Sequence, residues 1–252
     1  GASRVRMVAT SAPRDAANRE EFVDGVPRLL GVAPEVISGD EEARLSFAGA
    51  TFDLPADVPG PALVVDIGGG STEFVLGERP PVGRAATGGS TGQPRSTVVA
   101  ACSVDVGCVR LTERHFTSDP PAPTAVAAAG TDIEAALDAV SGPVPLDAAA
   151  SLIGLAGSVT TVGAIHLGLA GYDPAAIHHS RVPAGSVREI SDRLLAAERA
   201  ERAAIPVMHP GRVDVIAAGA LVLRHIVDRT GADEVVVSEH DILDGIAWSL
   251  AH

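Results

Sequence analysis

The pattern of apolar and polar positions alternates between short strands and longer helices along most of the chain. Continuous apolar runs and weaker alternation predict strands at residues 5–9, 35–37, 62–67, 72–76, 104–106, 151–155 and 234–237. Apolar residues at helical spacing predict helices at residues 18–30, 41–47, 109–116, 159–169, 185–202, 214–230 and 242–250, with an alanine-rich helix ending near residue 140. This alternation is typical of an α/β protein with a mixed sheet flanked by helices.

Two segments rich in proline and glycine interrupt the pattern. Residues 50–61 contain three prolines and are predicted to be a hinge between two domains, residues 1–55 and residues 56–252. Residues 79–95 have no periodicity and are rich in Gly, Pro, Ser and Thr, which predicts an exposed loop.

The run V-V-D-I-G-G-G-S-T-E-F at residues 64–74 carries the strongest chemical signal in the chain. Glycines expose main-chain N–H groups and allow them to converge on an anion, so the run predicts a phosphate loop made of Gly68, Gly69, Gly70, Ser71 and Thr72. Because two anions repel, Asp66 suits this loop when a divalent cation lies between carboxylate and phosphate, and Mg²⁺ prefers such oxygens. The alternative is a glycine-rich hairpin with Asp66 as a turn residue.

The order of strand, Asp, glycines, Ser-Thr and strand differs from the commoner nucleotide loops. A P-loop has a Lys after its glycines, and a dinucleotide fingerprint opens a helix with G-x-G-x-x-G. The run instead resembles the second phosphate loop of the actin-like ATPase fold group, and specifically the exopolyphosphatase and guanosine pentaphosphate phosphohydrolase family. Four further segments resemble that family: V-A-T-S-A-P-R-D-A-A-N-R at 8–19, I-S-G-D-E-E-A-R-L-S-F at 37–47, G-L-A-G-S-V-T-T at 154–161 and D-V-I-A-A-G-A-L-V-L at 214–223.

This resemblance covers nearly the whole chain and implies actin-like ATPase (ribonuclease H-like) domains. Family members begin with a strand and a first phosphate loop, D-x-G-[ST]-N-S, before the V-A-T-S-A segment, which begins here at residue 8. We therefore expect the first domain to be incomplete, and the chain alone to be weakly active or inactive and less stable in its first 50 residues than in the remainder.

The resemblance also implies two catalytic carboxylates. Glu42 corresponds to the base that activates water, and Glu73 corresponds to a second acidic residue that assists metal or water, with Asp66 as its partner metal ligand. A carboxylate crowded by phosphates has a raised pKa and works as a base near neutrality. The alternative is that Glu41 and Glu42 only stabilise the start of a helix.

Further phosphate contacts are expected from a second turn and from two arginines. Gly157 and Ser158 precede a helix, whose free N–H groups and dipole attract anions, although a tight turn without a ligand is the alternative. The resemblance assigns Arg14, and similarly Arg212, to the substrate channel. Guanidinium groups suit phosphate oxygens, but solvated surface arginines are the alternative.

Composition excludes several classes of protein. A net charge of −13 over 252 residues argues against broad nucleic-acid binding. No apolar run reaches the roughly 18 residues of a membrane span, so no membrane partner and a cytoplasmic location are expected. Cys102 and Cys108 lack zinc-site spacing and are predicted to be reduced thiols. The histidines lack H-x-x-x-H spacing and are predicted to be surface or core residues, among them His178, His179, His209 and His240.

The function predicted from these features is a Mg²⁺-dependent phosphohydrolase. It would release terminal phosphate from inorganic polyphosphate, convert guanosine pentaphosphate to tetraphosphate, or do both. One alternative is an ATP-dependent kinase of the same fold group, in which the E-E-A-R and V-A-T-S-A-P-R-D segments have no evident role. Another is a non-catalytic sensor of polyphosphate or guanosine tetraphosphate. The sequence leaves the substrate and the oligomeric state open, although homodimers are common among relatives.

Overall fold

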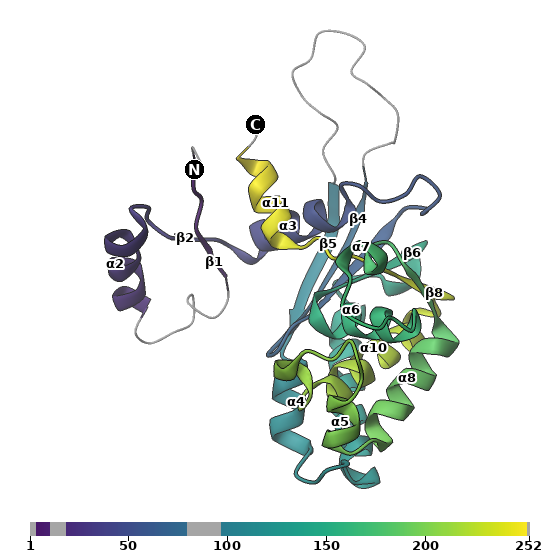
Figure 1. The fold of residues 1–252 in the computed structure, drawn as a ribbon. Coiled ribbons are helices and arrows are strands. Elements are labelled where there is room, and N and C mark those ends of the chain that lie inside the picture. The colour runs from purple at the N-terminus through teal and green to yellow at the C-terminus, as the bar shows by residue number, and fades with distance from the viewer. Residues whose placement is uncertain (1–3, 11–18, 80–96, 251–252) are drawn as a thin grey trace.

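A six-stranded mixed sheet forms the centre of the computed structural model, which describes residues 4–10, 19–79 and 97–250 (Figure 1). The strand order is β5-β4-β3-β6-β8-β7. The three central strands β3, β6 and β8 run parallel, and the other three are antiparallel to their neighbours. Their bounds are β3 (Ala62–Ile67), β4 (Thr72–Glu78), β5 (Thr97–Val104), β6 (Ser151–Leu155), β7 (Arg181–Pro183) and β8 (Glu234–Val237). The predicted α/β architecture is therefore confirmed.

The central strand β3 is apolar on both faces because helices cover both faces of the sheet. Leu63 and Val65 point into the larger core, which they share with helices α4 (Cys108–His115), α5 (Pro123–Ser141), α6 (Ala156–His166), α8 (Ala184–Ala196) and α10 (Ile216–Thr230). Val64 points to the opposite face, where it packs with Phe47 of α3 (Gly39–Thr51). Successive side chains of a strand alternate between faces. Asp66 therefore lies on the same face as Val64, beneath α3.

Helix α3 is crossed at close range by the last helix, α11 (Ile242–Ser249). A Cβ atom on Gly245 would lie 2.0 Å from the main-chain oxygen of Leu45, and one on Gly49 would lie 1.8 Å from that of Asp241. Both values are far inside a normal contact distance, so the two backbones touch at these glycines. This crossing fixes the start of α11, including Asp241, against α3.

We expect Gly245→Ala to lower the free energy of unfolding by about 1–3 kcal/mol, because the added methyl group must push α11 away from α3. The matched control is Gly185→Ala in α8, where an added Cβ has no heavy atom within 4 Å. Alanine there should stabilise the helix by roughly 0.5–1 kcal/mol. Urea denaturation of both variants measures the difference, and a Gly245→Ala protein as stable as wild type would show that the helices are not in this close contact.

The N-terminal part forms a separate small unit in Figure 1. Strands β1 (Val8–Ala9) and β2 (Glu35–Val36) make a two-stranded parallel sheet, and α2 (Arg19–Leu30) connects them. Helix α3, although it belongs to the predicted domain 1–55, packs on the six-stranded sheet. The division at residue 55 stays a prediction.

Two local predictions differ from the structure, and a third falls mostly on residues that the structure does not describe. The strand expected at 104–106 is the longer edge strand β5, whose residues alternate between exposed and half-buried. The helix expected at 185–202 is interrupted, because Glu198 and Glu201 form a capping box that begins a new helix, α9 (Arg199–Ala203). Most of the loop expected at 79–95 lies outside the described residues. The short helix α7 (Pro174–Ile177) completes the set of described α-helices, and none of the described helices is long and apolar enough to cross a membrane.

Candidate functional site

The predicted site residues meet where the three parallel strands end. Parallel strands place their carboxyl ends at one edge of a sheet, and α/β proteins bind ligands beyond that edge. Asp66 is near the end of β3 and is aligned with Leu155 at the end of β6. Gly157 follows β6, and Asp241 follows β8. Segments far apart in the sequence therefore reach a common region.

The glycine loop is held by the N-terminus of α4. The N–H of Cys108 donates to Gly68 O at 3.0 Å, and that of Val109 donates to Gly69 O at 2.9 Å. A Cβ on Gly107 would lie 2.5 Å from Gly69 O, so this approach requires glycine. Within the described chain, the hydrogen bonds of the loop leave three main-chain N–H groups without a protein partner, those of Gly69, Gly70 and Ser71. These groups are available as donors, and their binding to phosphate stays a prediction.

Two of the predicted phosphate-binding hydroxyl groups are instead engaged inside the protein. Thr72 is buried and donates from Oγ1 to Val106 O at 2.6 Å. Ser158 is also buried and hydrogen-bonds the thiol of Cys108. Burial raises the pKa of Cys108, which is a free, reduced thiol between the two predicted anion loops, as expected for this residue. Phosphate binding by Thr72 and Ser158 stays a prediction, for which their main-chain N–H groups are the available donors.

Four carboxylates gather beside the glycine loop. Asp66 and Glu73 are directly paired across β3 and β4, so their side chains lie on the same face. Burial, with the negative charges of Glu73, Asp241 and Glu42, raises the pKa of Asp66 to about 7. Such a concentration of carboxylate oxygens is the donor set that Mg²⁺ prefers. The residues therefore fit a divalent cation at this position.

Three different elements position the neighbours of Asp66. Glu42 lies in the first turn of α3, whose N-cap Ser38 accepts the N–H of Glu41. Asp241 caps α11, where its carboxylate accepts the N–H of Leu243 at 2.7 Å. Glu73 accepts hydrogen bonds through Oε1 from the hydroxyls of Ser71 at 2.5 Å and Ser103 at 2.9 Å. The crossing of α3 and α11 brings the first two onto one face of the sheet.

The raised pKa of Asp66 predicts a pH dependence of stability in the absence of divalent cations. The folded protein holds this proton more tightly than the unfolded chain, so the contribution of Asp66 is most favourable below about pH 4 and is lost as the pH rises to about 7. Asp66→Asn should flatten the stability profile in this window. Urea denaturation between pH 4 and pH 8 in chelator measures it, and identical profiles for the two proteins would contradict the shift.

The second turn brings Gly157 and Arg212 together, and their predicted contacts with phosphate stay a prediction. Ala156 has a positive φ of 65°, and this sharp turn lets α6 begin directly after β6. A Cβ on Gly157 would lie 2.2 Å from the Arg212 guanidinium, which therefore rests on the bare glycine backbone. Arg212 also donates to Thr161 Oγ1 at 3.2 Å. Arg14 lies outside the described residues, so its role stays a prediction.

Sequence reasoning missed two charged residues at the site. Asp241 could have been found from the sequence, because it lies four positions after the apolar strand β8. Residues just beyond the carboxyl end of a buried strand often belong to the ligand site in such sheets. Nothing in the sequence indicated Arg110, because only the fold places it beside the loop. Its Nε donates to Gly70 O at 2.7 Å and its Nη2 donates to Asp105 Oδ1 at 3.2 Å.

Comparisons with known proteins found a matching family model and similar proteins. The model of the Ppx/GppA phosphatase family matches residues 1–252. Exopolyphosphatase 2 of Mycobacterium tuberculosis strain H37Rv is 47% identical over 259 residues, covering 99% of this chain and 76% of that protein. Guanosine-5'-triphosphate,3'-diphosphate pyrophosphatase of Aeromonas salmonicida is 25% identical, covering 99% of this chain and 45% of that protein. The crystal structure of an exopolyphosphatase-like protein superposes with a TM-score of 0.87 at 41% identity, covering 98% of this chain and 77% of that one.

Proposed function

The chain belongs to the Ppx/GppA phosphatase family, a family of phosphoanhydride hydrolases, and on this premise we propose that it releases terminal phosphate from inorganic polyphosphate. The observation that carries the proposal is the group of four carboxylates formed by Asp66 and its three neighbours. It lies next to a glycine loop in which three N–H groups have no protein partner among the described residues. The carboxylates suit a divalent cation, and the N–H groups of the glycine loop suit an anion. A phosphate chain with its cation satisfies both.

Mg²⁺ is the cation that these residues fit best. Asp66, Glu73 and Asp241 would hold it, and it would neutralise oxygen charge on the phosphate that is being transferred.

The chain's own residues supply the other requirements of phosphoanhydride hydrolysis. The N–H groups of Gly69, Gly70 and Ser71 bind and orient the phosphate oxygens, because no other protein group in the described residues uses them. Arg212 adds a guanidinium at the second turn. Glu42, close enough for its charge to act on Asp66, accepts the proton of the attacking water.

Two observations favour polyphosphate over guanosine pentaphosphate. The relative named an exopolyphosphatase is 47% identical, whereas the one named a guanosine pyrophosphatase is 25% identical. Arg110 and Arg212 also provide guanidinium groups at both loops, which suits several successive phosphates. Guanosine pentaphosphate is the second candidate, since the phosphate loops would serve a nucleotide pentaphosphate equally.

Phosphate release from purified protein tests the proposal. Long-chain polyphosphate, guanosine pentaphosphate and ATP are each supplied with Mg²⁺ and with chelator. Mg²⁺-dependent release that is fastest with polyphosphate supports the proposal. Binding of polyphosphate without release would instead establish a sensor, and phosphoryl transfer from ATP to an acceptor would establish a kinase.

We further propose a cytoplasmic location, which accords with the finding that no described helix could cross a membrane, and a homodimer, which rests on membership of the family. With a net charge of −13, nucleic acid is not a proposed partner.

A further inference from the structure

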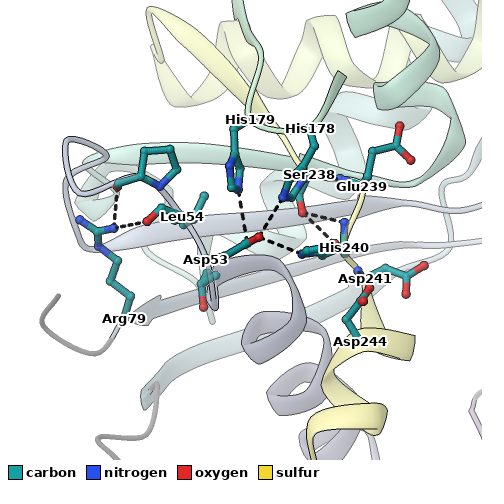
Figure 2. Close-up of polar contacts among 12 residues, drawn as sticks. Asp53, Leu54, Arg79, His178, His179, Ser238, Glu239, His240, Asp241 and Asp244 are labelled. Atoms are coloured by element: carbon teal, nitrogen blue, oxygen red, sulfur yellow. Dashed lines mark hydrogen bonds and ion pairs between the residues drawn. The ribbon is translucent and has the colours of Figure 1, made fainter. Parts of the chain in front are cut away.

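Three histidines surround the carboxylate of Asp53, apart from the four carboxylates of the candidate active site (Figure 2). His178 Nε2 lies 3.1 Å and His240 Nδ1 lies 3.3 Å from Asp53 Oδ2. His179 Nε2 lies 3.4 Å from the other oxygen, Oδ1. One ligand atom from each of Asp53, His178 and His240 can be chosen so that all lie within 4.8 Å of one another.

The four residues come from three segments that the backbone holds firmly. Asp53 follows α3, the histidine pair follows α7, and His240 lies between β8 and α11. The N–H of His179 donates to Val237 O at 2.7 Å, and His179 has a left-handed backbone with φ 61°. Ser238 Oγ accepts the N–H of His240 at 3.0 Å. Strained backbone of this kind is most often retained at functional sites.

Two of the imidazole nitrogens are buried without a hydrogen bond. These are His179 Nε2 and His240 Nδ1, although each lies close to a carboxylate oxygen of Asp53. Two atoms bound to one tetrahedral zinc ion at about 2.0–2.1 Å are about 3.3–3.4 Å apart, and neither points directly at the other. The separations of His178 Nε2 and His240 Nδ1 from Asp53 Oδ2 agree with that arrangement. A bound ion would also supply the partner that His240 Nδ1 lacks among the described residues.

We propose that Asp53, His178 and His240 form a binding site for one transition-metal dication of the zinc type, with His179 packed against His178. Imidazole nitrogen suits zinc, cobalt and nickel, whereas Mg²⁺ prefers oxygen. The donor set of two imidazoles and one carboxylate, with a fourth position left to water, therefore separates this site from the all-carboxylate group around Asp66. The ion would join the end of α3 to the segment that leads into α11.

The proposal requires one proton to move. The N–H of Glu239 donates to His178 Nδ1 at 3.1 Å, so in the metal-free protein Nε2 of His178 carries the proton and donates to Asp53. Metal binding displaces protons from its ligands. A neutral His178 bound through Nε2 then carries its proton on Nδ1, and its contact with the Glu239 amide opens. Among the described residues no hydrogen bond fixes the tautomer of His240 through Nδ1, so this nitrogen can face the ion without its proton.

The competing interpretation is a metal-free cluster in which Asp53 is held by histidine ring protons alone. In that case Asp53 would only accept a hydrogen bond from His178, and the other two rings would only pack. The rings do stack, with centroids 3.7 Å apart for His178 and His179 and 4.3 Å apart for His178 and His240. The two interpretations differ in affinity for a metal, which is directly measurable.

Co²⁺ titration of the full chain, in the presence of excess Mg²⁺, tests the proposal. Tetrahedral Co²⁺ with nitrogen ligands gives strong visible absorption, whereas the aqueous octahedral ion gives almost none. We expect one equivalent of Co²⁺ to develop this absorption and one equivalent of Zn²⁺ to remove it. At a free Zn²⁺ concentration one hundred times Kd, the unfolding temperature should rise by about 5–10 °C.

Matched variants locate the ion. His240→Gln and Asp53→Asn should each weaken Co²⁺ binding by about 10–100-fold or more. The control His115→Gln removes a histidine that also contacts an aspartate, Asp132 at 2.8 Å, and should bind Co²⁺ like wild type. Asp66→Asn should also retain the Co²⁺ absorption, which separates this site from the candidate active site.

The measurement on the wild-type chain can overturn the proposal by itself, so the test does not depend on whether a variant folds. Absence of tetrahedral Co²⁺ absorption in the wild-type chain overturns the proposal. So does absorption that survives unchanged in His240→Gln and Asp53→Asn, or that disappears only in Asp66→Asn. Failure of phosphate release in the experiment above would leave this result unaffected, since the Co²⁺ readout needs no substrate.

Discussion

Replacing Glu42 with glutamine is expected to reduce turnover by roughly two to four powers of ten, the range for loss of a general base. Glutamine keeps the size and hydrogen-bonding capacity of the side chain but cannot accept a proton from water. Glu42 begins α3 on the face of the sheet that carries Asp66, and its charge is felt at that carboxylate. Steady-state phosphate release from polyphosphate measures the effect, with phosphate binding and folding expected to stay close to wild type.

The neighbouring residue provides the control. Glu41 lies in the same helical turn but makes ion pairs with Arg6 at 3.6 Å and Arg44 at 3.9 Å. Exposed pairs of this kind contribute little to stability, so Glu41→Gln should retain nearly full activity. If Glu42→Gln kept more than a third of wild-type activity, the base would have to be another residue.

Asp66→Asn should abolish Mg²⁺-dependent activity, with a loss of at least about 100-fold, because the cation supplies several kcal/mol of charge stabilisation in such reactions. Asparagine is nearly isosteric and removes one charge from a crowded group, so the fold should persist. Titration calorimetry with Mg²⁺ and a phosphate analogue should show the loss of affinity directly. The structure places Asp241 and Glu73 beside Asp66, so weak residual binding through these two is expected.

An exposed aspartate elsewhere serves as the control for Asp66. Asp147 lies in a short 3₁₀ turn after α5, and Asp147→Asn changes the net charge equally. It should leave Mg²⁺ binding and phosphate release unchanged. Mg²⁺ affinity in Asp66→Asn equal to that of wild type would place the cation at another site.

The sequence predicted the central elements of the fold well, for a local reason. Strand β3 begins with four consecutive apolar residues, as expected for a strand covered on both faces, and its predicted bounds match the structure. Helix ends were less accurate where a cap decides them. The helix expected at 185–202 breaks at Glu198, because a capping box with Glu201 competes with continuation. Edge strand β5 was misplaced because only one of its faces is covered.

The glycine loop could be predicted as a candidate phosphate site because its chemistry is local. Gly68, Gly69 and Gly70 are adjacent in the chain, and their lack of side chains leaves the main-chain N–H groups accessible to an anion. Family membership was likewise predicted from short motifs, and the family model confirms it over residues 1–252.

The partners of that loop were decided by tertiary structure alone. Asp241 reaches Asp66 only because β3, β6 and β8 are parallel and because α11 crosses α3 at two glycines. The histidines that the sequence indicated as ordinary surface or core residues gather around Asp53 from positions more than 120 residues away. The spacing of residues in the sequence can predict a binding site when its ligands share one turn or one helix face. When each ligand arrives on a different element, only the packing of those elements determines that they meet.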